Sequence, residues 1–234
     1  MRILALETSA KAVSAAVTED GKVLCSGYQD TGLTHSRTLM PIVEAMLKNT
    51  GLTVQDCDAV AVAAGPGSFT GIRIGVSAAK GLAFAADKPC AAVSTLEAMA
   101  RNVAHMDALV VCSMDARRSQ IYNALFEIRG GKPVRLCGDR AISLAELGEE
   151  LGKMQKSAFL VGDGAQLCYN TCLDMGIPAV LAPGNLVSQS AWGVAMAAFG
   201  QTPAPAEELL PVYLRLSQAE RERQARLAAQ AAQE

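Results

Sequence analysis

The pattern of apolar and polar positions in residues 1–104 predicts three strands followed by alternating helices and strands. A tight hairpin is expected at Asp20-Gly21, because this pair accepts the left-handed backbone of a two-residue turn. Apolar residues at helical spacing predict a helix that ends at Gly51, with Pro41 kinking it or confining its regular part to the residues after the proline. The expected strands are residues 3–6, 13–18, 22–28, 59–64 and 89–93, and the expected helices are residues 36–50, 70–86 and 95–103.

The same order of elements restarts after residue 104. The expected strands are residues 109–114, 120–128, 133–137 and 158–161, and the expected helices are residues 144–151, 165–175 and 187–199. A duplicated βββαβα unit is the plan of the actin-like and hexokinase-like ATPases. We therefore predict an α/β protein with the duplicated ASKHA (ribonuclease-H-like) fold. Its expected parts are a first lobe at 1–104, a second lobe at 105–200, and a return segment with a C-terminal helix at 201–234.

Composition indicates the class of protein but gives little information about its reaction or ligands. Half of the 234 residues are hydrophobic, 19% are charged and the net charge is −2, which is typical of a well-cored globular protein. The basic residues are scattered, so the sequence alone indicates no footprint for nucleic acid, and contact with it would need a partner. The seven cysteines include no CxxC pair, which favours reduced thiols in the cytosol, with Cys168 and Cys172 buried. We expect no signal peptide and no membrane span.

The segment that joins the strand at 59–64 to the helix at 70–86 is rich in glycine. Its backbone N–H groups would lie at a helix N-terminus, where an anion is stabilised. The segment lacks the Gly-Lys-Ser/Thr of a Walker A loop, and Thr70 replaces the third glycine of a dinucleotide loop. Contact with phosphate and a tight structural turn both remain open. The candidate anion-binding residues are Gly65, Gly67, Ser68, Thr70, Gly71 and Arg73.

The helix at 70–86 is apolar on nearly every side. Such a helix must be covered on more than one face, and the second cover is either another subunit or the protein's own core. The preceding helix, at 36–50, could lie beside it and share an interface with a partner. The candidate interface residues are Leu39, Val43 and Met46 on the first helix and Ile74, Ala78 and Leu82 on the second.

Glu7 and Asp115 each end a strand that precedes a second strand. In a duplicated actin-like fold such acids can face the cleft between the lobes and hold a metal-bound nucleotide, whereas in the simpler alternative they satisfy turn amides. The sequence contains two histidines and no G-x-S-x-G elbow, so we expect no catalytic residues and no metal ligands.

Several of these segments resemble one family. Leu4-Ala5-Leu6-Glu7-Thr8-Ser9 is similar to the start of threonylcarbamoyladenosine-biosynthesis proteins, and the stretch Gly65-Pro66-Gly67-Ser68-Phe69-Thr70-Gly71-Ile72-Arg73 resembles the signature of the TsaB (YeaZ) family. Supporting matches are Asp115-Ala116-Arg117 with Tyr122, Gly162-Asp163-Gly164 and Pro211-Val212-Tyr213-Leu214-Arg215. The resemblance spans residues 3–215.

The resemblance implies a non-catalytic subunit of the complex that forms N6-threonylcarbamoyladenosine at position 37 of ANN-decoding tRNAs. Such a subunit pairs with the catalytic paralogue TsaD, recruits the ATPase TsaE, forms a homodimer when alone and meets tRNA through the complex. No cofactor is required by the resemblance, and ATP or ADP at a subunit interface stays open.

Two positions depart from the related patterns. The catalytic paralogue binds its metal through two histidines one helical turn apart, and the matching positions here are Thr95 and Met99. A hydroxyl and a thioether cannot replace two imidazoles, so the metal site should be absent. Glu7 stands where many TsaB-type chains have Asp, which leaves its nucleotide role open. The competing hypotheses are an independent actin-like ATPase or peptidase, and a stand-alone homodimeric scaffold.

Overall fold

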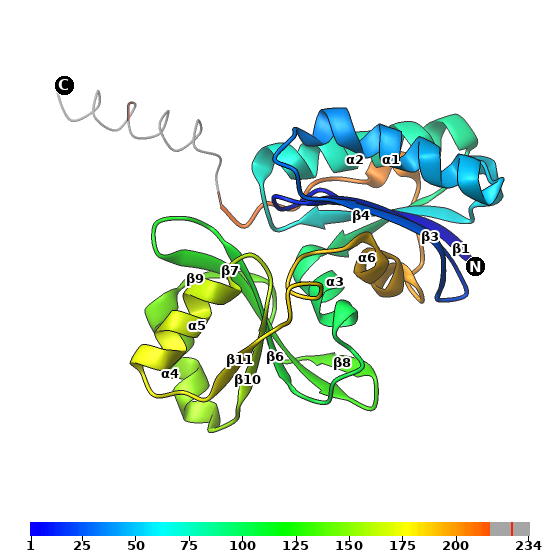
Figure 1. The fold of residues 1–234 in the computed structure, drawn as a ribbon. Helices are drawn as coiled ribbons and strands as arrows, with labels where there is room; N and C mark the ends of the chain where they lie inside the picture. Colours follow the sequence, from blue (N-terminus) through cyan, green and yellow to red (C-terminus); the bar gives the residue numbers. More distant parts are fainter. Residues whose placement is uncertain (216–225, 227–234) are drawn as a thin grey trace.

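The computed structural model describes residues 1–215 and Arg226, and it divides into two lobes, each built on one sheet (Figure 1). The C-terminal helix expected at 217–233 lies outside the described residues, apart from Arg226. In the first sheet the strand order is β3-β2-β1-β4-β5, with β2 antiparallel to β1 and β3, and β4 parallel to β1 and β5. These strands are β1 (Arg2–Glu7), β2 (Val13–Glu19), β3 (Lys22–Gln29), β4 (Ala59–Gly65) and β5 (Cys90–Ser94).

The second sheet repeats this plan. Its order is β11-β10-β6-β7-β8, with β9 also paired to β7, so β6, β7 and β10 take the places of β1, β2 and β4. The predicted fold class, a duplicated βββαβα unit of the actin-like type, is confirmed by this topology. The strands are β6 (Leu109–Asp115), β7 (Gln120–Arg129), β8 (Lys132–Arg135), β9 (Arg140–Ser143), β10 (Ala158–Val161) and β11 (Ala179–Leu181).

The helices form layers on the faces of both sheets (Figure 1). α1 and α2 cover the outer face of the first sheet, α3 and α6 lie between the sheets, and α4 and α5 cover the far face of the second. α1 runs unbroken through Pro41, so its regular part is not confined to the residues after the proline. The bounds are α1 (His35–Thr50), α2 (Phe69–Ala86), α3 (Thr95–Asn102), α4 (Leu144–Met154), α5 (Ala165–Asp174) and α6 (Ala191–Ala198), with short 3-10 helices at Val54–Asp56 and Ala206–Glu208.

The middle layer crosses the expected boundary between the lobes. α6, which we assigned to the second lobe, packs against the first sheet, where Val194 joins the cluster around Ile3 and Ala61. α3, from the first half of the chain, contributes Leu96 and Met99 to the core of the second lobe. Each lobe is therefore completed by a helix from the other half of the sequence.

Several short elements differ from the expected ones. β9 and β11 were missed, because four and three residues give too short a pattern to detect. β8 ends at Arg135 instead of continuing to Cys137, whose thiol accepts a hydrogen bond from the backbone N–H of Leu125. The last helix begins at Ala191 instead of residue 187. At this first residue the backbone N–H donates to Ser14 Oγ at 2.9 Å.

Candidate functional site

A cleft of about 690 Å³ lies between the lobes, at the ends of β1, β4 and β6. Its walls come from the β1–β2, β4–α2, β6–β7 and β10–α5 connections and from the segment at 211–215. These five segments are far apart in the sequence, and the fold brings them together. The lining residues are Ser9, Ala10, Lys11, Gly67, Ser68, Phe69, Thr70, Met114, Asp115, Ala116, Arg117, Tyr122, Asp163, Val212, Tyr213, Leu214 and Arg215.

The glycines of the signature segment allow close backbone packing. A Cβ at Gly67 would lie 2.5 Å from the carbonyl oxygen of Ser9, and one at Gly71 would lie 2.1 Å from that of Thr8. At Gly75 it would lie 2.3 Å from the Thr8 hydroxyl, which donates to the Gly71 carbonyl at 2.7 Å. A side chain at any of these positions would displace the β1–β2 loop. Tight packing therefore accounts for the spacing of the signature glycines. This supports the tight structural turn, one of the two alternatives that the sequence leaves open beside contact with phosphate.

This packing also uses some of the N–H groups that an anion would need. The Ser68 N–H donates to the Ser9 carbonyl at 2.6 Å, and the Gly71 N–H donates to Ser68 Oγ at 3.3 Å. Gly67, Ser68 and Thr70 nevertheless line the cleft. Binding of an anion by this loop stays a prediction, with fewer donors than the sequence indicates.

Residues 211–215, which we call the strap, connect the two lobes across the cleft. The Val212 N–H donates to the Ala64 carbonyl at 2.7 Å, and a Cβ at Gly65 would lie 2.1 Å from Val212 O. Tyr213 stacks on Phe69 with ring centres 4.2 Å apart, and its hydroxyl accepts from Arg73 Nε at 2.9 Å. The predicted anion-binding residues Gly65 and Arg73 thus hold the strap instead of lining the cleft.

The two predicted cleft acids have different environments. Asp115 lines the cleft, and its carboxylate accepts from the Arg117 N–H at 2.7 Å, as expected for a turn acid. Glu7 is only 1% exposed and is not part of the cleft lining, so its assignment as a cleft acid is corrected. Glu7 Oε1 accepts from the Ser9 N–H at 2.6 Å, and Oε2 has no hydrogen-bond partner within the described part of the chain. Burial raises the pKa of Glu7 to about 7, with a smaller contribution from the charge of Asp163.

Asp163 is a cleft residue that we did not predict. It lies between Gly162 and Gly164, and a Cβ at Gly162 would lie 1.9 Å from the Ser113 carbonyl, so the chain packs tightly there too. Gln189 Nε2 donates to Asp163 at 2.8 Å, but loss of solvation dominates and, together with the charge of Asp115, raises the pKa of Asp163. An acid between two glycines after a strand was the only sequence signal, and we used it for the resemblance alone.

The two positions that we matched to the paralogue's metal ligands, Thr95 and Met99, are buried. Thr95 is 0% exposed and Met99 is 1% exposed, with Met99 packed among the apolar residues of the second lobe. In residues 1–215, no three His, Cys, Asp or Glu side chains are grouped as a metal ion would need. Cys168 and Cys172 are buried, as predicted, and burial raises the pKa of Cys168 to about 11.

The three residues predicted on α1 for the partner interface are wrong, because the protein buries them in its own core. Leu39, Val43 and Met46 are at most 3% exposed, because their helical spacing directs them into the core beneath α1. On α2, Ile74, Ala78 and Leu82 are half-buried and pack at the margin of the same core. Exposed apolar residues on α2, on α1 and just before α1 are Phe84 at 82%, Met40 at 43% and Leu33 at 46%. We did not predict Phe84, because helical periodicity identifies the residues that face the protein's own core and gives no signal for an exposed apolar residue.

No helix within the described residues is both long enough and apolar enough to cross a membrane. Two sheets of one plan, exchanged middle helices and a cleft between the lobes define the actin-like (ASKHA) class of proteins.

The comparisons with known proteins narrow this class. The family model for TsaD, tRNA N6-adenosine threonylcarbamoyltransferase, matches residues 29–205. The tRNA threonylcarbamoyladenosine biosynthesis protein TsaB of Bacillus subtilis is 32% identical over 221 residues, which cover 94% of this chain and 96% of the relative. The solved structure of YeaZ from Pseudomonas aeruginosa has a TM-score of 0.74 at 28% identity, covering 91% of this chain and 99% of that one. The chain belongs to the TsaB (YeaZ) family, so the resemblance predicted from the sequence is confirmed.

Proposed function

We propose that the chain is a non-catalytic subunit of the complex that forms N6-threonylcarbamoyladenosine at position 37 of ANN-decoding tRNAs. The observation that carries the proposal is the likeness to TsaB of Bacillus subtilis along nearly the whole of both chains. The buried Thr95 and Met99 support the non-catalytic part, since neither offers an imidazole at the positions of the paralogue's metal ligands. Because tRNA is the substrate, the proposal places the chain in the cytoplasm.

The proposed partners are TsaD, paired through the surface of α1 and α2, and the ATPase TsaE. In the absence of TsaD, the same surface would form a homodimer. Phe84 supports this assignment, because a phenyl ring exposed to 82% loses much of its contact with water when a partner covers it. ATP or ADP at a subunit interface remains compatible with the proposal.

Reconstitution tests the proposed function. We expect TsaD and TsaE, supplied with ATP and an activated threonylcarbamoyl donor, to modify an unmodified ANN-decoding tRNA with this chain present, and the rate to fall at least tenfold when it is omitted. Phe84→Asp should weaken pairing with TsaD about tenfold or more, because an aspartate in an apolar interface loses its hydration. Pairing is measured by gel filtration and titration calorimetry.

The matched control is Val180→Asp, which introduces the same charge at an apolar residue of β11 that is 55% exposed on the other lobe. Pairing of this variant with TsaD should equal that of the wild type. Full modification without the chain would contradict the proposed function. ATP hydrolysis by the purified chain at about one turnover per second, lost in Asp163→Asn, would instead favour the independent ATPase.

A further inference from the structure

Basic residues from three segments that are distant in the sequence meet at the cleft: Lys11, Arg117 and Arg215 line it, and Arg118 is next to Arg117. We call Lys11, Arg117, Arg118 and Arg215 the basic rim. Lys11 comes from the β1–β2 loop, the two adjacent arginines from the β6–β7 turn, and Arg215 from the end of the strap. Arg215 Nη1 donates to the Ala116 carbonyl at 2.7 Å, which holds it beside the turn. The fold thus assembles a basic cluster that the scattered basic residues of the sequence did not indicate.

Few carboxylates pair with the charges of the rim in the part of the chain that the structure describes. Within residues 1–215, no carboxylate lies within 4.0 Å of the guanidinium groups of Arg117, Arg118 or Arg215. The Lys11 ammonium lies 3.7 Å from Asp30, but its side chain is 76% exposed. Unpaired cations clustered on one edge create a local positive potential that attracts polyanions.

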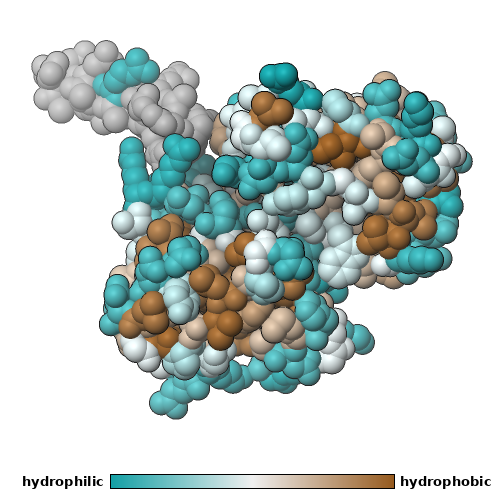
Figure 2. Space-filling model, in the orientation of Figure 1, coloured by the Kyte–Doolittle hydropathy of each residue, from teal (hydrophilic) through white to brown (hydrophobic). Residues whose placement is uncertain are grey.

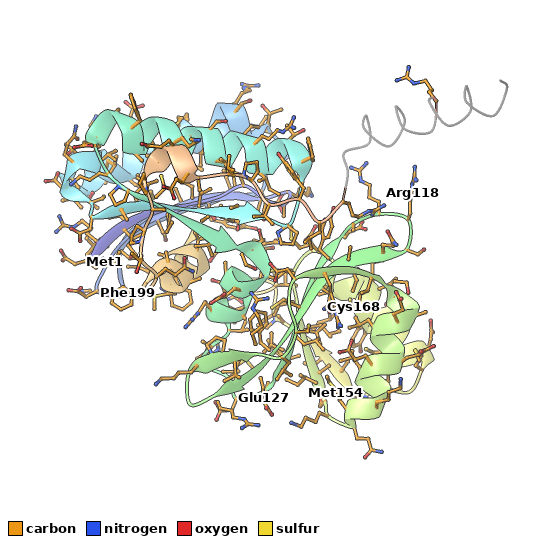
Figure 3. The ribbon with its side chains drawn as sticks, turned by 180° about the vertical axis from the view of Figure 1, so that it is seen from behind. Met1, Arg118, Glu127, Met154, Cys168 and Phe199 are labelled. Carbon is orange, nitrogen blue, oxygen red and sulfur yellow. The ribbon has the colours of Figure 1, made fainter. Side chains whose placement is uncertain are left out.

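The β6–β7 turn presents its two arginines to solvent. Figure 3 shows Arg118 at the outer end of the turn, directed away from the sheet, and Figure 2 shows a hydrophilic surface there. Residues 117, 118 and 119 have φ angles of 62°, 58° and 56°, a left-handed backbone that arginine and serine disfavour. Both arginine side chains are exposed, so packing in the core does not account for the unfavourable turn. Backbone strain of this kind is concentrated at sites of binding.

The charges below the rim determine which anion fits. Asp115 and Asp163 line the cleft and repel a phosphate that enters it deeply. A ligand with several phosphates spaced along a chain can contact the rim and stay outside the acidic floor. One face of the Tyr213 ring stacks on Phe69, but the residue is 37% exposed and lines the same cleft, so the rest of the ring can contact an unpaired base.

We propose that the basic rim binds the phosphodiester backbone of RNA, in an unpaired or loop region of the tRNA that the complex modifies. The proposal rests on the proposed function and adds a direct contact between this chain and tRNA. Phosphate contacts of this kind give affinity and orientation without reading sequence. The rim would therefore position the tRNA and leave its recognition to other contacts.

The test measures binding of a fluorescently labelled, unmodified ANN-decoding tRNA to the complex of this chain with TsaD, by anisotropy at several salt concentrations. The first variant is Arg117→Asn with Arg118→Asn, because asparagine removes the charge and tolerates a left-handed backbone. We expect binding to weaken about tenfold, and the slope of log K against log salt to become shallower by about one to two. The melting temperature should stay unchanged.

Two further variants separate charge from structure. Arg117→Lys with Arg118→Lys keeps both charges and should retain most of the affinity, because a phosphate contact needs a cation more than a particular shape. Arg129→Asn removes an exposed arginine from the opposite end of β7, where it pairs with Glu127, and should bind tRNA like the wild type.

The rim proposal would be overturned if the double asparagine variant bound tRNA like the wild type, or if Arg129→Asn lost as much affinity. It would also be overturned if the variant had lost ATP binding, which would make the rim a nucleotide site, or pairing with TsaD, which would make it a protein interface. If modification still required this chain but the rim variants bound tRNA like the wild type, the rim proposal would be overturned and the proposed function would stand. Dispensability of the chain for modification would overturn the proposed function.

Discussion

Gly71→Ala is expected to lower the free energy of unfolding by about 3 kcal/mol. Alanine is the better helix former by about 1 kcal/mol, so propensity alone predicts a gain. The added Cβ, however, would lie 2.1 Å from the Thr8 carbonyl oxygen, an atom of the backbone that cannot rotate away. Relief of this clash requires α2 and the β1–β2 loop to separate, which also strains the bond from the Thr8 hydroxyl to the Gly71 carbonyl. Unfolding in urea, monitored by circular dichroism, measures the effect.

Gly81→Ala is the matched control in the same helix. No atom lies within 4 Å of the position of its added Cβ, so only helix propensity acts there. We expect the free energy of unfolding to rise by about 0.5–1 kcal/mol. If the Gly71→Ala variant were as stable as the wild type, packing would not explain the signature glycines. Anion binding by the loop would then be the favoured explanation.

Glu7→Gln should remove much of the loss of stability that the wild type undergoes as the pH rises from 4.5 to 7. The pKa of Glu7 is about 7 in the folded chain and 4.5 in its ordinary state. Between these values the folded chain retains a proton that the unfolded chain has released. The free energy of unfolding therefore falls through this window, by up to about 3 kcal/mol, and is level above it.

Glutamine stays neutral and keeps an oxygen that accepts the Ser9 N–H, although its amide nitrogen takes the place of the unpartnered Oε2. At pH 8 we expect the variant to be about 2 kcal/mol more stable than the wild type, and at pH 5 the two should differ little. The raised pKa of Asp163 acts with the same sign, so part of the slope remains. Urea unfolding across this pH range measures the slope, with Glu44→Gln on the exposed side of α1 as control. An unchanged slope in Glu7→Gln would contradict the burial of this carboxyl group.

Most of the fold could be predicted from the sequence, because its signals are local. Runs of apolar residues marked β1 and β4, and helical spacing marked α1 and α2. The exchange of α3 and α6 could not be predicted, since an apolar helix such as α6 fits either sheet by its own composition. The neighbour of α6 is seen only in the folded protein, where α6 packs closely on α3. A Cβ at Gly193 of α6 would lie 2.2 Å from the carbonyl oxygen of Ala98 in α3.

The candidate site was only partly predictable for a related reason. The signature glycines and Asp115 were found because they are contiguous with strand ends. Arg117 and Arg215 were noted only as parts of the family resemblance and Lys11 was not noted at all, because these residues form a cluster only through contacts between distant loops. Periodicity on α1 misled the interface prediction, because the residues that repeat most regularly, such as Leu39 and Val43, are those that the protein buries in itself.

The exchanged middle helices also bear on how the chain matures during synthesis. A ribosome that has released only residues 1–104 has made all five strands of the first sheet but not α6, so one face of that sheet is still uncovered. The strap that fastens Val212 to Ala64 arrives later still. The first lobe, although translated first, must therefore wait for nearly the whole chain before its core closes. Nascent chains of this family would expose apolar surface for most of their translation, and chaperones that act at the ribosome would have a long time in which to bind it.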